Sequence, residues 1–341
     1  MRRDAVSRRT FLRTGLVAAG SAVLSGTLGA PEAWATEGPP IIDCDAWGAR
    51  PSSADVNVVS QRPVKILVHH TATANVPDLG RPAADLLARM IQQFHMDRRG
   101  WLDSGQHFTI SRGGFVLEGR HRSLEVLHSG DRQVEGAHCT GQNLVAIGIE
   151  SEGTYVDVDP PEGLWNQLRD LCSYICHQYG IPGTEIYGHR DYKDTACPGD
   201  RLYGMLPRLR GEVAHALGQP LARREVVKAT WPLLRPSDVG PPVSAAQHLL
   251  RGAGFPEVVA TGRFDATTAA AVVRLQTSGH FEQINGMIGG ESWPALARTV
   301  RRGEGGEGEK AVEALLTGRS AEGVPDVVTP KVWQRLLGTG A

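Results

Sequence analysis

The sequence carries almost no net charge, with 36 Lys and Arg against 37 Asp and Glu and a formal net charge of −1. The first 35 residues contribute five arginines against Asp4 and Glu32, so the remainder of the chain carries about −4. Proteins that bind nucleic acid or an anionic membrane surface usually present an excess of Lys and Arg. We therefore expect that neither nucleic acid nor a membrane is the partner of the mature chain.

A convincing membrane-spanning run is also missing. The apolar stretch at residues 16–28 is rich in Gly, Ser and Ala, whereas a spanning helix needs about 20 mainly apolar residues. It follows Ser7-Arg8-Arg9-Thr10-Phe11-Leu12 and precedes the small-residue site Ala33-Trp34-Ala35, which is the pattern of a twin-arginine export signal. Residues 1–35 are thus predicted to be the signal peptide of a secreted, extracellular or wall-associated protein. An uncleaved anchor is the alternative.

Cysteine is scarce, with five residues in the chain. If Cys197 is a metal ligand, Cys44, Cys139, Cys172 and Cys176 remain, and an even number in a secreted chain permits disulfides. The last two lie four apart on a predicted helix, whose geometry disfavours a bond between them. A bond between Cys44 and Cys139 is one expectation. The alternative is that all four are buried thiols.

From residue 41 to residue 217, short apolar runs alternate with amphipathic segments. Strands are predicted over residues 64–70, 107–111, 115–118 and 144–150, with the middle two forming a hairpin. Helices are predicted over residues 83–97, 162–179 and 199–217, the second of them stopped by Gly180 and Pro182. Strands interleaved with helices of this length indicate an α/β domain whose sheet is covered by helices.

The pattern changes after a charged linker at residues 218–230. Short apolar segments at helical spacing, joined by Gly-rich turns, fill residues 231–300, and a weaker echo of them follows at residues 301–341. This self-similarity predicts a small all-α domain built from an internal repeat, in which the second copy is degenerate.

Two soft metal ligands, His189 and Cys197, lie on one predicted loop that can fold both of them onto a single ion. A histidine at the end of the strand at residues 64–70 would complete a set of three. Two nitrogens and one thiolate, with a fourth position left to water, make up a common catalytic zinc site. His69 and His70 point to opposite faces of that strand, so only one can face the ion, and strand geometry does not choose between them. A buried cysteine near an unrelated histidine is the alternative.

Hydrolysis at such a site needs a base and a group that stabilises the oxyanion. The strand at residues 144–150 places Ala146, Gly148 and Glu150 on one face, where the small residues would leave room for a substrate or metal. Glu150 is therefore the predicted base, the alternatives being an exposed carboxylate or the partner of an arginine. Thr195 is predicted to support the oxyanion, the alternative being a hydroxyl that caps its own loop.

Seven motifs carry a resemblance that covers residues 41–210. They occur in this order: Trp47-Gly48-Ala49-Arg50, Val68-His69-His70-Thr71, Phe94-His95 leading to Gly100-Trp101, Glu118-Gly119-Arg120, Gly136-Ala137-His138 with Asn143, Ile147-Gly148-Ile149-Glu150, and Gly188-His189-Arg190-Asp191. The series resembles the zinc-dependent N-acetylmuramoyl-L-alanine amidases of the peptidoglycan recognition protein superfamily.

The resemblance implies a central mixed sheet flanked by helices, with zinc at the floor of a groove. It implies cleavage of the amide between N-acetylmuramic acid and L-alanine of the stem peptide. It also makes His69 the third metal ligand and leaves a structural role to His70. His138 and Asn143 are implied to contact the substrate or line the groove, with a structural role as the alternative.

One position departs from the pattern. Many relatives have a catalytic tyrosine where this chain has Gln106, which cannot act as a base. Members without the tyrosine resemble this chain in having a glutamate at the position of Glu150, and there it takes the catalytic role. Gln106 would then be a substrate contact. The glutamine also leaves open a non-catalytic peptidoglycan recognition protein, and a zinc peptidase acting within the stem peptide is a third possibility.

The C-terminal segment is similar to the peptidoglycan-binding domains of cell-wall hydrolases over residues 231–300, although the usual Asp-Gly before the aromatic is replaced in Gly262-Arg263-Phe264. The similarity implies a module that tethers the enzyme to its substrate and raises the local concentration. A helical appendage packed on the catalytic domain is the alternative. The expected protein is a monomer whose partner is peptidoglycan, in the form of muramyl peptides, and whose cofactor is Zn²⁺.

Overall fold

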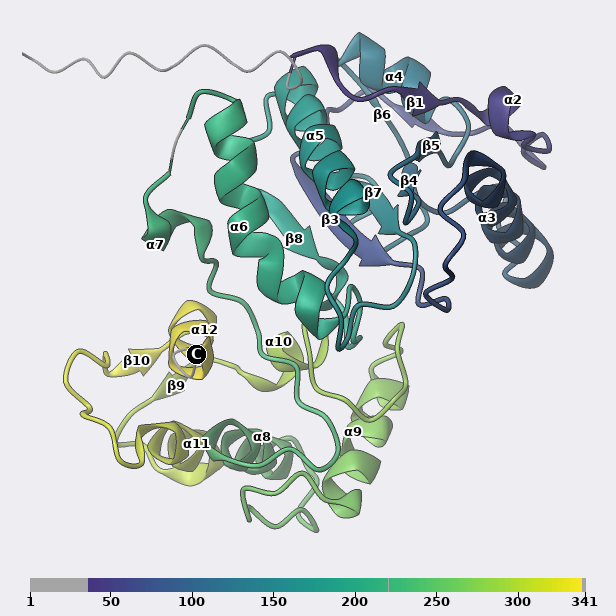
Figure 1. Cartoon of the computed structure of the whole chain (residues 1–341). Coiled ribbons are helices and arrows are strands. Elements are labelled where there is room, and N and C mark those ends of the chain that lie inside the picture. Colours follow the sequence, from purple (N-terminus) through teal and green to yellow (C-terminus); the bar gives the residue numbers. More distant parts are fainter. Residues whose placement is uncertain (1–35, 220, 339–341) are drawn as a thin grey trace, which may run out of the picture.

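A computed structural model describes residues 36–219 and 221–338, which form an α/β domain followed by a helical domain (Figure 1). The predicted export signal at residues 1–35 lies outside the described residues. Within the described part of the chain, no helix combines the length and the apolar composition that crossing a membrane would require.

Six strands form a mixed sheet in the order β1-β5-β4-β7-β3-β8. β3 is parallel to its neighbours β7 and β8, and β4 is parallel to β7 but antiparallel to β5. Both faces of β3 are buried, which explains its continuous apolar sequence. The strands are β1 (Ile41–Ile42), β3 (Lys65–His70), β4 (Phe108–Ile110), β5 (Val116–Glu118), β7 (Ala146–Ser151) and β8 (Ile186–Gly188).

Helices cover both faces of this sheet. Val116 of β5 belongs to the main core, which includes α5 (Glu162–Tyr179) and α6 (Asp200–Ala216), whereas the next residue, Leu117, packs with α2 (Cys44–Trp47) and α3 (Arg81–Gln93). Successive strand residues point to opposite faces, so these two helix groups lie on opposite sides. Figure 1 shows α5 and α6 side by side along the strands, with α3 on the side of β4 and β5.

The predicted elements of this domain form, with small differences at their ends. α5 has the predicted bounds and ends at Gly180, whose φ of 70° is left-handed and favours glycine. The predicted hairpin is β4 with β5, shorter than expected. The helix predicted to reach Asp97 leaves α geometry after Gln93 and continues as a π-helical turn, Phe94–Arg98. The remaining elements of this half are α4 (Ser123–Ser129), the ribbon of β2 (Val58–Val59) with β6 (Gln133–Val134), a 3₁₀ turn (His189–Asp191) and α7 (Arg223–Val226).

The expected bond between Cys44 and Cys139 is wrong. All five cysteines are free thiols, and Cys44 packs in the cluster with Trp47 while Cys139 packs with Leu67 in another. Cys172 and Cys176 are buried in the main core under α5. The alternative of buried thiols therefore holds, because each of these four sulfurs fills space in an apolar cluster.

One hydrophobic core runs through the C-terminal domain from Trp231 to Leu337, so the two segments of the predicted repeat share a single interior. Trp231 and Trp293 stack at its centre, with ring centroids 6.1 Å apart and planes 14° apart. α8 packs against α11, and a two-stranded ribbon joins the helices. The elements are α8 (Pro241–Gly252), α9 (Ala266–Ser278), α10 (Ser292–Leu296), β9 (Val300–Arg301), α11 (Gly306–Leu316), β10 (Val327–Val328) and α12 (Pro330–Gly338).

Candidate active site

The three predicted metal ligands meet at one edge of the sheet. His69 lies near the carboxyl end of β3, and His189 begins the turn directly after the adjacent parallel strand β8. Cys197 returns on the same loop, which is closed by a hydrogen bond from the Arg190 amide to the Cys197 carbonyl (3.0 Å). One ligand atom from each of these three residues lies within 4.8 Å of the others.

These donors fit a zinc ion. Tetrahedral zinc with two nitrogens and one sulfur places its ligand atoms about 3.3–3.7 Å apart, and His69 Nδ1 is 3.8 Å from Cys197 Sγ. His189 Nε2 is buried and has no hydrogen-bond partner among the described residues. Burial lowers the pKa of His189 to about 4, so the imidazole is neutral and can act as a ligand. Burial also raises the pKa of the Cys197 thiol, a cost that a nearby cation would offset.

The structure distinguishes the two adjacent histidines. His69 turns toward Cys197, whereas the Nδ1 atom of His70 accepts a hydrogen bond from the Tyr155 amide (3.3 Å). The amide of His70 donates to Cys197 Sγ (3.3 Å), which favours a negatively charged sulfur. His70 therefore braces the site through its backbone and holds Tyr155 through its ring.

A chain of hydrogen bonds sets the tautomer of His69. His138 Nε2 lies 3.3 Å from the Ala146 carbonyl, which can only accept, so this nitrogen carries the proton. His138 Nδ1 is then the acceptor for the Nε2–H of His69, 3.1 Å away. His69 is left with an unprotonated Nδ1, the atom that faces Cys197. Burial lowers the pKa of both His69 and His138, which keeps the two rings neutral.

His138 also corrects one expectation. A Cβ atom at Gly148 would lie 2.5 Å from the His138 ring, so the space beside β7 is occupied by this side chain and not by a substrate. Gly148 is required for close packing of the histidine.

Glu150 lies at the same edge. It pairs in register with His69 across β7 and β3 and lines the cavity that contains the three ligands. Its Oε2 atom is buried and has no hydrogen-bond partner within the part of the chain described, so it is not the partner of an arginine there. Burial raises the pKa of Glu150 to about 8. Such a carboxyl group is suited to exchange a proton near neutral pH.

The other predicted site residues divide into two groups. Thr195 and Gln106 line the cavity. The Thr195 hydroxyl accepts a hydrogen bond from the Cys197 amide (3.2 Å). The Gln106 side-chain amide donates to the Thr109 hydroxyl, and its buried Oε1 atom has no hydrogen-bond partner among the described residues. Asn143 is not among the cavity-lining residues. Its Oδ1 atom accepts from the amides of His138 (3.0 Å) and Cys139 (2.9 Å), so in this structure it shapes the loop that places His138.

The cavity has a volume of about 510 Å³, and two parts of its lining were missed by sequence reasoning. One is formed by His95, Arg99 and Trp101, which follow α3. The other comes from the helical domain and comprises Glu282, Gln283, Asn285 and Met287. The first segment contains the motif Phe94-His95 leading to Gly100-Trp101, so its place at the cavity could have been predicted from the family resemblance. The second carries no signal in the sequence, because only tertiary packing brings it to the site.

Comparison with known proteins agrees with this arrangement. Residues 60–200 match the family described as N-acetylmuramoyl-L-alanine amidase, and residues 239–296 match the family described as putative peptidoglycan binding domain. Peptidoglycan recognition protein 1 of Bos indicus is 32% identical over 170 residues, which are 49% of this chain and 82% of that protein. The chain belongs to the family of peptidoglycan recognition proteins and N-acetylmuramoyl-L-alanine amidases.

The share of the relative that the match covers differs between family members. The N-acetylmuramoyl-L-alanine amidase of Homo sapiens is 34% identical over 165 residues, which are 47% of this chain but only 26% of that protein. The solved structure of Drosophila PGRP-LB is 26% identical with a TM-score of 0.43, covering 49% of this chain and 92% of that chain.

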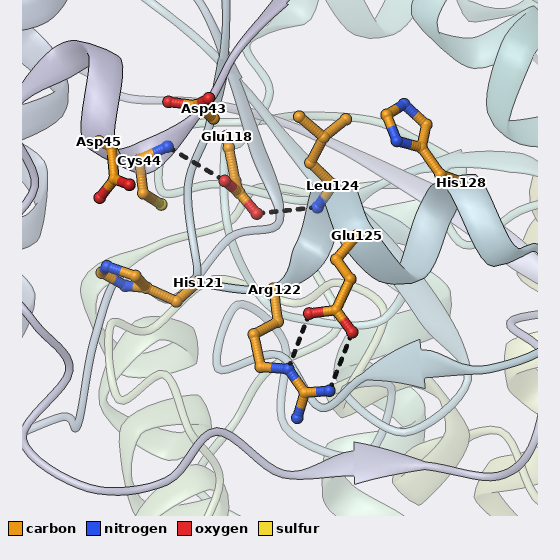
Figure 2. Close-up of a pocket in the computed structure, with 9 residues that line it drawn as sticks. All are labelled: Asp43, Cys44, Asp45, Glu118, His121, Arg122, Leu124, Glu125 and His128. Atoms are coloured by element: carbon orange, nitrogen blue, oxygen red, sulfur yellow. Dashed lines mark hydrogen bonds and ion pairs between the residues drawn. The ribbon is translucent and has the colours of Figure 1, made fainter.

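A family motif that is remote from the metal ligands has a structural role. A second cavity has a volume of about 370 Å³. It is lined by Glu118 of the Glu118-Gly119-Arg120 motif, which lies between α2 and α4 (Figure 2). Its two carboxylate oxygens accept hydrogen bonds from the amides of Cys44 (3.1 Å) and Leu124 (2.8 Å). The carboxylate thus satisfies amides at the starts of two helices that have no partner within the helix.

Replacing Glu118 with glutamine should therefore destabilise the fold. The amide NH₂ would face one of the two backbone N–H donors, and losing a buried bond to a charged group costs about 1–3 kcal/mol. Urea denaturation measures this loss. Glu125→Gln, which breaks an exposed pair with Arg122, is the matched control and should change stability by less than about 1 kcal/mol. Equal losses in the two variants would contradict this role of Glu118.

Proposed function

We propose that this protein is a secreted, zinc-dependent hydrolase that cleaves the amide between N-acetylmuramic acid and L-alanine in bacterial peptidoglycan. The observation that carries the proposal is one cavity that brings together His69, His189 and Cys197 with Glu150, whose Oε2 atom has no hydrogen-bond partner in the described part of the chain. The proposed substrate, peptidoglycan, agrees with the descriptions of the two families that the chain matches. Export through the twin-arginine signal at residues 1–35 is part of the proposal.

Zinc held by the three ligands would supply a Lewis acid, which polarises the scissile carbonyl and lowers the pKa of the attacking water. Glu150 accepts the proton of that water and returns it to the nitrogen of the leaving L-alanine. Its buried Oε2 has no hydrogen-bond partner among residues 36–219 and 221–338, so it can take part in both transfers. Thr195 Oγ1 already accepts from the Cys197 amide, so its own hydroxyl proton remains available to donate to the oxyanion.

The second candidate function is recognition of peptidoglycan without hydrolysis. Gln106 favours it, since a glutamine stands in the cavity where many relatives have a catalytic tyrosine. The family includes proteins named for recognition as well as proteins named as amidases. The complete ligand set and Glu150 argue for the enzyme.

Product analysis separates these functions. Muramyl peptides incubated with the mature protein should release a peptide with a free L-alanine amine, detected by mass spectrometry. A chelator should abolish the release, and added zinc should restore it. Intact substrate that nonetheless binds the zinc-loaded protein would establish the recognition function, whereas cleavage between two amino acids would identify a peptidase.

A further inference from the structure

A carboxylate of the metal-ligand loop is anchored in the helical domain. Asp194, between His189 and Cys197, is fully buried. Its Oδ1 atom accepts from the amides of Gly289 (2.7 Å), Glu291 (3.2 Å) and Ser292 (3.0 Å). Its Oδ2 atom accepts from the Gln276 side chain (3.0 Å) and the Ser292 hydroxyl. All five donors belong to the helical domain.

The neighbouring residue extends this contact. Lys193, almost fully buried, forms ion pairs with Glu291 (2.9 Å) and Glu282 (3.1 Å). Glu282 also accepts from the amide of Thr140, two residues after His138. The interface thus reaches both the ligand loop and the loop that places His138.

Backbone packing at the interface is equally close. Gly290 donates its amide to the Lys193 carbonyl (3.3 Å), and a Cβ atom at Gly290 would lie 2.4 Å from the carbonyl group of Asp191. Nothing larger than glycine fits at this point without displacing the backbone at Asp191 and Tyr192 or at residue 290 itself.

These contacts are not those of a flexible tether. A buried carboxylate is tolerated only where donors compensate for its lost hydration, and here every donor to the Asp194 side chain comes from the other domain. The same packing places Glu282, Gln283, Asn285 and Met287 in the lining of the cavity.

We propose that the helical domain is a working part of the amidase site. Residues 289–292 hold the loop that carries His189 and Cys197, with Asp194 as the positioning residue, and residues 282–287 form one wall of the muramyl-peptide cavity. This inference rests on the proposed function, and it goes beyond tethering because loss of the contact alters the metal site itself.

The test is Gly290→Ala in the full chain, compared with Gly252→Ala. The control adds the same methyl group to the same domain, where its nearest described neighbour is Glu307 Cβ at 3.4 Å. Gly290→Ala should weaken zinc binding, measured by chelator competition, about 10–100-fold, the loss typical when a group supporting metal ligands is removed. It should also increase hydrogen–deuterium exchange of residues 189–197 in the metal-free protein. Gly252→Ala should change neither. Unchanged zinc affinity and exchange in Gly290→Ala would overturn the proposal.

Two further full-chain variants keep the test decisive. Loss of the near-ultraviolet signal of the Trp231–Trp293 stack would show that Gly290→Ala unfolds the helical domain. In that case Asp194→Asn is used instead, because it keeps the side-chain volume but gives up one acceptor oxygen. It too should weaken zinc binding and increase the exchange of residues 189–197. Gln283→Ala should raise the KM for a muramyl peptide about two- to tenfold, with kcat and zinc affinity unchanged. An unchanged KM would show that residues 282–287 do not form a wall of the substrate cavity. Because the exchange measurement needs no zinc, a wild-type protein that fails to bind zinc or hydrolyse substrate would refute the proposed function separately.

Discussion

Glu150→Gln should lose about 10²–10⁴-fold in kcat while binding zinc as tightly as the wild type. Glutamine preserves the shape of the side chain at the end of β7 but cannot accept the proton of the attacking water. The measurement pairs turnover of a muramyl peptide with zinc affinity from chelator competition. Full activity with zinc bound would show that another group is the base.

Glu152→Gln is the matched control. This carboxylate lies two residues further along, accepts a hydrogen bond from the Arg112 amide (2.7 Å) and is not among the residues that line the cavity. Its variant should keep wild-type turnover, although it loses some stability. A comparable loss of kcat in both variants would point to a general disturbance of the sheet edge.

The same Glu150 substitution should stabilise the metal-free protein in alkaline solution. Burial raises the pKa of Glu150 from 4.5 to about 8, so between these values the folded state holds a proton that the unfolded state has released. Its contribution to stability is complete below pH 4.5 and is lost as the pH rises through about 8. At pH 9 the variant should exceed the wild type by a few kcal/mol, since each pKa unit corresponds to about 1.4 kcal/mol. Urea unfolding in the presence of a chelator measures the free energy of unfolding of both proteins as a function of pH. Parallel profiles for the wild type and the variant would contradict the prediction.

Cys197→Ala should abolish zinc binding at micromolar concentrations and hydrolysis with it. Removing a ligand should cost more than the 10–100-fold in affinity that follows from losing a group hydrogen-bonded to one. At zinc concentrations 1,000 times the Kd, the wild type should gain about 4 kcal/mol of stability, and the variant should gain none. Thermal unfolding with and without zinc measures the difference.

Cys139→Ala is the control for this loss. The Cys139 thiol is buried in a small cluster with Leu67 and Ala146, so its removal destabilises the fold but leaves the three ligands in place. The stabilisation by zinc should therefore persist. A zinc response that survives in Cys197→Ala would remove this residue from the ligand set.

Short-range patterns predicted most of the α/β domain. The apolar run that became β3 and the helix stopped at Gly180 depend on neighbours in sequence, and both form where expected. The meeting of His189 with Cys197 could also be anticipated, because both lie on one predicted loop, whereas the strand β8 that brings His189 beside His69 was not predicted. Strand geometry could not choose between His69 and His70; that choice came from the family resemblance.

Contacts between distant segments could not be predicted in this way. The absence of a side chain at Gly148 does leave space beside β7, but the His138 ring fills it. The sequence does not show which side chain will pack against a glycine. No role was predicted for Asp194, because its partners lie 82 to 98 residues further along the chain. Asn143 was expected as a groove residue because it belongs to a motif, yet its amide oxygen is held by two backbone donors.

The distance along the chain between Asp194 and Ser292 has a consequence for biosynthesis. The ribosome adds Cys197 well before Ser292, and the carboxylate of Asp194 lacks its buried partners until the helical domain has been made and folded. The metal-ligand loop therefore reaches its final shape late, after the sheet is complete. A chain interrupted before α10 would have all three candidate ligands but not the amides of residues 289–292 that hold their loop through Asp194.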